Sequence, residues 1–374
     1  MLPLLLLAGV AAAPSVRAQC ALPGLEEPPR MPGVPFEELV RRADEASEAG
    51  QAVEAVRFYR AGVALNPLWD DGWWRLGQLF VDAGCHGEAR DALRRLVRLQ
   101  PTAGPGWTLL GLAEYHQGDF DQAKADLSRG MALGVSSTPE VGRQGLLAQT
   151  LLHVRGGDFA SAAKNLNILV QVAPDDPGFV VACGLIALRI GKLPKDVTEA
   201  ERELVLLTGR AVRAALTGRM DEARRGFDEL IAKYPRRRGV HLAYAFVLSR
   251  ASATEALAQL RREAELFPDN AEAHLEIAFE TLERGDPREA LEPARAAARL
   301  DPDSFWSHLA LGRALLVAGA VEEALSHLEN AARLAPERRD VYLALAQAYA
   351  RAGRPSDVER ARLKLQELDT RREP

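Results

Sequence analysis

Residues 73–101 read WWRLGQLFVDAGCHGEARDALRRLVRLQP. Apolar side chains recur at steps of three and four residues on both sides of Gly84, a spacing that predicts two amphipathic helices. Glycine adopts the left-handed conformation that ends a helix at little steric cost, and Pro101 ends the second helix because proline cannot continue one. Ala89 is small enough to lie where two helices approach closely. The stretch therefore predicts a helical hairpin.

The same three marks recur along the chain with a period of about 34 residues. The residue that ends each first helix is glycine with one alanine exception: Gly50, Gly84, Gly118, Gly157, Gly191, Gly218, Ala251, Gly285, Gly319 and Gly353. Alanine follows five residues later in eight of these ten units: Ala55, Ala89, Ala123, Ala162, Ala223, Ala256, Ala290 and Ala324. Proline closes seven units: Pro67, Pro101, Pro174, Pro235, Pro268, Pro302 and Pro336. Residues 36–370 are therefore predicted to form an all-α array of hairpins.

The second unit resembles the tetratricopeptide-repeat (TPR) pattern, which is W-x2-L-G-x2-Y followed by A-x3-F and P. Its matching residues are Trp73, Leu76, Gly77, Phe80, Ala89, Leu93 and Pro101. The third unit matches with Trp107, Leu110, Gly111 and Ala123, but has Glu114 at the tyrosine position. Because ten units recur in register, the chain resembles the TPR family over nearly its whole length. The resemblance implies a right-handed superhelical solenoid of helix-turn-helix repeats.

One unit departs from the pattern after the first helix that is predicted to end near Gly191. No second helix follows, and Thr198 and Glu201 instead form a capping box that opens a new helix. We therefore divide the chain into an N-terminal array (36–191), an irregular break (192–198) and a C-terminal array (199–370), with ten first helices and nine second helices. The break is either a kink between two superhelical halves or an inserted binding loop. We expect a minimum of local stability there, because each unit of a solenoid is held by its neighbours.

The composition excludes several classes of protein. With 47% hydrophobic and 26% charged residues, the chain is typical of a folded, helix-rich protein and not of a disordered one. Forty-seven basic against 52 acidic side chains give a net charge of -5, so no basic surface is available to attract nucleic acid or an anionic membrane. The partners expected are therefore proteins or peptides.

The first residues have the pattern of an export signal. An apolar run from Leu2 to Ala13 precedes Val16-Arg17-Ala18, and this order predicts cleavage after Ala18. The run of about 12 residues is too short to span a membrane, so no integral membrane span is expected. Residues 1–18 are thus a predicted signal peptide, residues 19–35 an N-terminal tail, and the mature protein is expected in the periplasm or outside the cell.

Three cysteines in an exported chain leave room for one disulfide and one free thiol. Cys183 lies in the apolar run GFVVACGLIAL and is interpreted as a core thiol. Cys20 in the tail and Cys85 after a turn glycine form the candidate pair, which would fix the tail to the array. The alternative is that both remain unpaired and partly buried.

No catalytic motif is present among those that identify metalloproteases, serine hydrolases, nucleotide-binding loops, redox pairs or calcium loops. Cys85-His86 and Tyr115-His116 lack the second ligand pair that a zinc site needs. The sequence therefore predicts a protein that is not an enzyme, with no cofactor and no metal.

In TPR proteins first helices generally line the concave face, so the resemblance implies that positions 2, 5, 9, 12 and 13 of each unit face a groove. Position 9 is apolar in the centre of the array and polar at its ends: Asp44, Gln78, Leu112, Leu151, Leu185, Val212, Ala245, Phe279, Arg313 and Gln347. An exposed apolar strip is typical of a surface that a partner covers. Two alternatives stay open: superhelical winding buries position 9, or the N-terminal tail occupies the groove.

Aromatic and basic residues surround this strip and supply candidate binding hot spots. The predicted partner-binding set is Trp74, Gln78, Leu112, Tyr115, His116, Leu151, Arg155, Leu185, Arg189, His241, Phe279, Arg313 and Arg351. Its basic members favour an acidic or C-terminal peptide segment. Val40 and Asp44 stand where the carboxylate clamp of heat-shock-binding TPR domains has lysine and asparagine, which disfavours that partner. We expect Leu151→Lys and Phe279→Lys to abolish binding without loss of helicity.

These features favour a scaffold or adaptor of the cell envelope that holds a partner protein or peptide in its concave groove. An accessory subunit of an envelope enzyme, or of polysaccharide or secretion machinery, is the alternative. Stable co-purification with an enzyme would distinguish that alternative from the adaptor.

Overall fold

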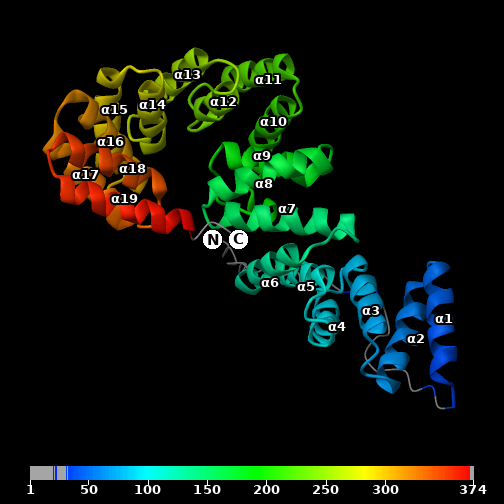
Figure 1. The fold of residues 1–374 in the computed structure, drawn as a ribbon. Coiled ribbons are helices and arrows are strands. Elements are labelled where there is room, and N and C mark those ends of the chain that lie inside the picture. The colour runs from blue at the N-terminus through cyan, green and yellow to red at the C-terminus, as the bar shows by residue number, and fades with distance from the viewer. Residues whose placement is uncertain (1–19, 21, 23–30, 32, 371–374) are drawn as a thin grey trace, which may run out of the picture. The chain divides into compact units, whose positions relative to one another are not determined.

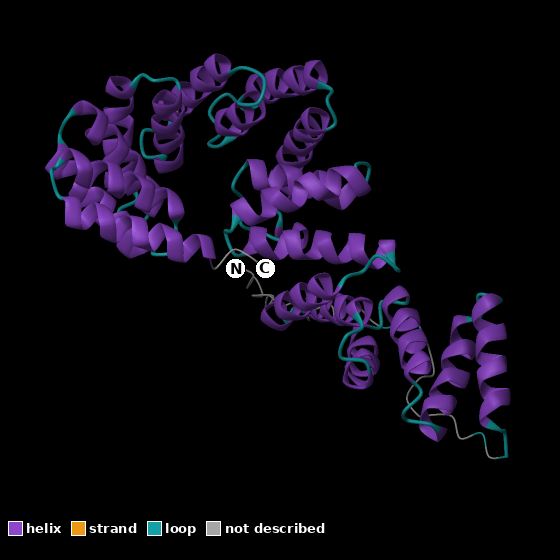
Figure 2. Ribbon diagram, viewed as in Figure 1, coloured by secondary structure: helices purple, strands orange, loops and turns teal. Residues whose placement is uncertain are grey.

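The computed structural model describes residues 20, 22, 31 and 33–370, and this part of the chain is helical, with no strand (Figure 2). Its 19 α-helices follow one another as antiparallel pairs in chain order, as the ten first and nine second helices predict (Figure 1). The predicted signal peptide and most of the tail lie outside the described residues. The chain divides into two compact units, Met1–Ala173 and Pro174–Pro374.

Unit 1 consists of four hairpins, each with a first and a second helix. Its helices are α1 (Phe36–Glu48), α2 (Ala52–Leu65), α3 (Asp70–Asp82), α4 (His86–Leu99), α5 (Gly104–Gln117), α6 (Phe120–Leu133), α7 (Pro139–Arg155) and α8 (Phe159–Val172). Each helix packs against its hairpin partner, and first helices also contact the next first helix, as α3 contacts α5 and α5 contacts α7. A continuous apolar core results, which runs through the hairpins instead of closing within any one of them.

The repeat marks have the roles that their chemistry predicts. Gly84 adopts φ = 71° in the turn between α3 and α4, a conformation that a residue with a side chain rarely adopts. The eight repeat alanines are all buried to 1% exposure or less: Ala55, Ala89, Ala123, Ala162, Ala223, Ala256, Ala290 and Ala324. Alanine at these positions lets the two helices of a hairpin lie close together.

Unit 2 begins with α9, and one of its turns includes a short 3-10 helix. Its helices are α9 (Pro177–Ala187), η1 (Pro194–Asp196), α10 (Glu199–Leu216), α11 (Met220–Lys233), α12 (Val240–Leu248), α13 (Ala253–Leu266), α14 (Ala271–Glu283), α15 (Pro287–Leu300), α16 (Phe305–Ala318), α17 (Val321–Leu334), α18 (Arg339–Arg351) and α19 (Pro355–Thr370). As in unit 1, first helices contact one another: α9 contacts α12, α14 contacts α16, and α16 contacts α18.

The irregular unit differs from the sequence-based interpretation in where its first helix ends. α9 ends at Ala187, and the residue with a left-handed backbone after it is Arg189, at φ = 55°, whereas Gly191 has no positive φ. The helix is shorter than predicted because Arg189, not the later glycine, turns the chain. A non-glycine residue in this conformation is uncommon and costs backbone strain.

The segment 192–198 is not the boundary between the units, which lies between Ala173 and Pro174. α10 takes the place of the missing second helix and packs directly on α9, where a Cβ atom on Gly184 would overlap the carbonyl oxygen of Val205. Leu193 and Val197 of the segment are buried. Lys192 Nζ binds both carboxylate oxygens of Glu201, at 2.9 and 2.7 Å, and Thr198 and Glu201 form the predicted capping box. The segment is therefore fixed to unit 2 at both ends.

Candidate functional site

The structure buries the centre of the predicted apolar strip. Leu112, Leu151 and Leu185 are 4%, 6% and 0% exposed, and Val212 and Ala245 are also buried. Successive first helices contact one another, and these five side chains are buried within the array, so they do not form an open apolar strip. The expectation of an open apolar groove at these positions is corrected. Lysine at Leu151 would bury a charge in the core and destabilise unit 1, so this substitution cannot test partner binding.

The predicted residues that remain accessible fall into separate groups. In unit 1, Tyr115 lies beside His116 and Phe120, with ring centroids 5.3 and 6.0 Å apart, and Arg155 stacks on the Phe120 ring at 4.3 Å. His116 also stacks on His86, with centroids 4.4 Å apart. This aromatic and basic cluster joins side chains from α4, α5, α6 and α7 at one corner of unit 1.

Trp74 and Gln78 lie on α3 and are half-buried. Trp74 lines a cavity of about 390 Å³ within unit 1, together with Asp70, Asp71 and Gln100.

In unit 2 the predicted residues do not form one surface. His241 is buried, with its Nδ1 atom 2.6 Å from Gln259 Oε1. Phe279 is half-buried and packs edge-on against Trp306, with ring centroids 5.8 Å apart. Arg313 and Arg351 are exposed, and Arg351 donates to the backbone carbonyl of Leu316. Arg189 lines a second cavity.

This second cavity, called here the α9/α12/α14 cavity, has a volume of about 290 Å³ and lies entirely within unit 2. Its apolar walls include Ile186 at the end of α9 and Leu242, Ala245 and Phe246 on α12. Glu276 and Glu280 on α14 and Arg189 after α9 also line the cavity, as do Ala256 and Leu260 on α13. Three first helices and the second helix α13 thus line one concave site.

The sequence analysis missed Phe246, Glu276 and Glu280. Phe246 follows the buried position 9 by one residue and is 49% exposed. Glu272, Glu276 and Glu280 recur every four residues, a spacing that places their side chains on one face of a helix and was visible in the sequence. The repeat register therefore located the right helices but the wrong face of α12.

The charges in the cavity are not balanced. Arg189 is held by Glu272, with Nε 2.6 Å from Oε1. No ion pair joins Glu276 or Glu280 to a cation in the described part of unit 2. The Glu276 side chain is exposed, yet the surrounding protein still desolvates it in part, and this desolvation, followed by repulsion from Glu272, raises the pKa of Glu276 above its usual range. The pKa of Glu280 is raised for the same reasons, by desolvation and then by Glu283.

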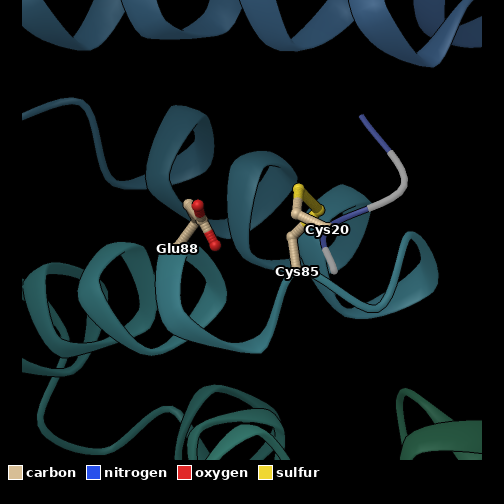
Figure 3. A group of neighbouring side chains, drawn as sticks. All are labelled: Cys20, Cys85 and Glu88. Atoms are coloured by element: carbon tan, nitrogen blue, oxygen red, sulfur yellow. A yellow bond between two sulfur atoms is a disulfide. The ribbon is translucent and has the colours of Figure 1, made fainter. Parts of the chain in front are cut away.

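Cys20 and Cys85 are joined by a disulfide bond that spans 65 residues of sequence, and Cys183 is a free, buried thiol. The two sulfur atoms lie within reach of Glu88, a group that could bind a metal ion if the thiols were free (Figure 3). With the sulfurs bonded to each other, only the Glu88 carboxylate is available, so this state offers no metal site. The described residues contain no other group of this kind.

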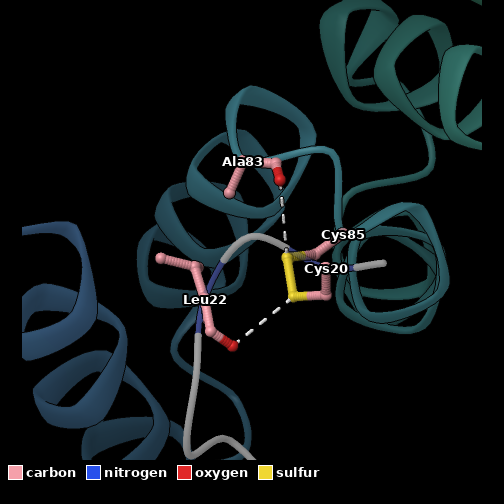
Figure 4. The surroundings of a disulfide bond; sticks show 4 residues. All are labelled: Cys20, Leu22, Ala83 and Cys85. Carbon is pink, nitrogen blue, oxygen red and sulfur yellow. Dashed lines mark hydrogen bonds between the residues drawn. A yellow bond between two sulfur atoms is a disulfide. The ribbon is translucent and has the colours of Figure 1, made fainter. Parts of the chain in front are cut away.

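The disulfide fixes the start of the tail to unit 1. The Cys20 sulfur lies 3.8 Å from the carbonyl oxygen of Leu22, and the Cys85 sulfur 3.8 Å from that of Ala83 (Figure 4). Cys20 and Leu22 both pack against the unit 1 core. Cys85 itself is buried at 1% exposure.

Among the described helices, none has the length and apolar character that a bilayer span requires.

Comparison with known proteins agrees with the repeat. A tetratricopeptide-repeat family model matches residues 40–104, 75–129, 147–215, 280–328 and 309–368, together more than half of the chain. Curated protein sequences give no significant match.

Solved structures similar to this chain include several of MamA. MamA from Desulfovibrio magneticus RS-1 (residues 41 to the end) is 17% identical, with 48% of this chain and 99% of that chain covered and a TM-score of 0.42. The structure titled "MamA MSR-1 C2" is 22% identical, with 46% and 98% covered and a TM-score of 0.39. Similarity of this extent does not indicate a shared function. The family assignment depends on the repeat matches, and by them the chain belongs to the tetratricopeptide-repeat family.

Proposed function

We propose that this protein is a scaffold that binds partner proteins or peptides, with the α9/α12/α14 cavity as its main binding site. The observation that carries the proposal is the exposed Phe246 ring beside apolar side chains, in a cavity lined by three first helices and by α13. An exposed aromatic side chain in a concave apolar site is a typical anchor for a partner. The protein is proposed to act by holding a partner and not by catalysis.

We also propose that the protein acts in the periplasm or outside the cell. The apolar run and small-residue cleavage pattern of residues 1–18 support this location. The Cys20–Cys85 bond is consistent with it, because disulfides persist in oxidising compartments. The predicted partner contacts that remain are the aromatic and basic cluster around Tyr115 and Arg155, Trp74 and Gln78 on α3, the half-buried Phe279, and the exposed Arg313 and Arg351.

Affinity capture tests the proposal. The tagged full chain, expressed with its own leader in its native cells, would be captured from the envelope fraction beside Phe246→Asp and a control, Leu363→Asp. Leu363 lies on α19 and is 55% exposed, so it matches Phe246 in exposure and chemistry but lies outside the cavity. The parent and the control should retain a common set of proteins that Phe246→Asp loses.

Two outcomes would contradict the proposal. If all three chains capture the same proteins, the cavity is not the binding site. If no protein is enriched over the untagged strain, the scaffold function itself is wrong. Capture of an envelope enzyme by the parent would make the chain an accessory subunit of that enzyme.

A further inference from the structure

The carboxylates of α14 are unusual for this chain. Elsewhere in unit 2, exposed carboxylates repeatedly meet arginine or lysine from a neighbouring helix, as Glu203 meets Lys233, Glu255 meets Arg224 and Glu289 meets Arg261. On α14 only Glu272 has such a partner. Glu276, Glu280 and Glu283 continue the same helix face with no ion pair among the described residues.

The carboxylates on this face of α14 repel one another, and this repulsion lowers the stability of the fold. Like charges three or four residues apart on a helix destabilise it. Arg189, the one cation among the described residues that line the cavity, is oriented by Glu272 and has a left-handed backbone conformation. Arg189 offsets part of the charge at Glu276, and Arg284 offsets part of the charge at Glu280, so two arginines face the four carboxylates of α14. A negative potential therefore remains on the α14 wall.

The two walls of the cavity differ in chemistry. The α12 wall is apolar and exposes Phe246, whereas the α14 wall carries Glu276 and Glu280. A ligand that fits both must have a cationic group on one side and an aliphatic surface on the other. Lysine and arginine side chains combine these features, because an apolar stem precedes the charged head.

We propose that the α9/α12/α14 cavity binds a partner segment in which a lysine or arginine is flanked by aliphatic residues. The cationic head lies between Glu276 and Glu280, and the aliphatic neighbours pack against Phe246 and Leu242. The charge complementarity sets the choice of partner, and the apolar contact contributes most of the affinity. This inference depends on the proposed function and narrows it to a basic, apolar segment, opposite in charge to the acidic segment that the sequence favours.

A peptide-display selection on the full chain tests this proposal. A library of random peptides would be selected on the parent, and the enriched peptides assayed by fluorescence anisotropy on Phe246→Asp and on three charge variants. The first variant removes the charge of the α14 wall by Glu276→Gln with Glu280→Gln. The second reverses the sign of that charge by Glu276→Lys with Glu280→Lys. The control is Glu322→Gln. Glu322 is exposed on α17, outside the cavity, and makes no ion pair among the described residues. All substituted side chains are accessible, and the thermal midpoint of each variant would show that it is folded.

The enriched peptides should contain a lysine or arginine beside aliphatic residues. Neutralisation should weaken their binding about tenfold or more, and the control should leave it unchanged. Peptides in which glutamate replaces the lysine should bind the charge-reversed chain in preference to the parent.

Three results would overturn the proposal. Enriched peptides that lose binding with Phe246→Asp but not with the neutralised chain would keep the proposed function and reject the basic ligand. Enrichment of acidic peptides would show that the cavity selects a partner of the opposite charge, and would reject the proposed basic ligand. Failure to enrich any peptide that depends on Phe246 would reject both the ligand and the cavity as a binding site. Equal binding of spermine and the peptide, both sensitive to neutralisation, would show a site for small polyamines and also reject the peptide partner.

Discussion

At the scale of single residues, Glu114 is a departure from the repeat pattern that places an ionisable side chain in the core of a hairpin. Glu114 stands at the tyrosine position of the third unit and is completely buried. Its Oε1 atom accepts a hydrogen bond from Arg94 Nη2 at 2.9 Å, while Oε2 has no hydrogen-bond partner within the described residues. Burial raises the pKa of Glu114 well above its usual range, Arg94 lowers it in part, and the nearby Asp126 raises it further.

This raised pKa makes unit 1 less stable as the pH increases. A carboxyl whose pKa is higher in the folded chain than in the unfolded chain takes up a proton on folding, so stability is lost as the pH rises between those two values. Glu114→Gln keeps a neutral group of the same shape. We predict that the variant gains a few degrees in thermal midpoint relative to the parent at pH 8 but not at pH 5.

Circular dichroism melts at both pH values measure this difference, with Glu322→Gln as the exposed control. A gain for Glu114→Gln that is the same at both pH values would mean that the buried carboxyl does not titrate in this interval. A loss at pH 8 would mean that the ion pair with Arg94 outweighs the burial of the charge.

At the scale of elements, the contact between α9 and α10 replaces a missing helix. Gly184 on α9 lies against the backbone of Val205, and Gly209 on α10 lies against the backbone of Val180. A backbone neighbour cannot move aside as a flexible side chain can. We predict that Gly184→Ala destabilises unit 2 by about 1–3 kcal/mol, as overpacking does in a dense core.

Urea unfolding followed by circular dichroism checks this value. Gly87→Ala is the matched control, because Gly87 also lies in a helix and its added methyl group would meet only the amide of Gln117, at 3.2 Å. The control should be neutral or slightly stabilising. Equal stability of Gly184→Ala and the parent would mean that α9 and α10 move apart at little cost in free energy. This result would agree with the predicted minimum of local stability at residues 192–198.

The elements were largely predictable from the sequence, because glycine, alanine and proline mark most of the turns and close contacts of the repeats. The length of α9 was not predictable, since Arg189 adopts a backbone conformation that is usual only for glycine. The candidate site was predictable only in part. Which face of a first helix stays open depends on how neighbouring repeats pack, and a local pattern does not contain that information. The four-residue spacing of Glu272, Glu276 and Glu280 is a sequence signal for the acidic side of the cavity.

At the scale of the whole molecule, the disulfide ties the tail to unit 1 alone. It closes 65 residues of sequence between Cys20 and Cys85, so removing it should increase the entropy of the unfolded chain. We predict that Cys20→Ser lowers the stability of unit 1 by about 2–4 kcal/mol and leaves unit 2 unchanged.

Hydrogen exchange with mass spectrometry reports the two units separately. Exchange should accelerate in α1 to α4 of Cys20→Ser, while α14 to α19 keep the rates of the parent. Thiol counting on the denatured, unreduced parent should give one free thiol, that of Cys183. Three free thiols would show that the bond does not form in the native protein.

The central claim is that a partner occupies the α9/α12/α14 cavity, and hydrogen exchange of the full chain with and without its captured partner tests it most directly. The account predicts that the partner slows exchange in α9, α12 and α14, and that it does not do so in Phe246→Asp. Slowed exchange confined to unit 1, or the same protection in Phe246→Asp as in the parent, would contradict the account.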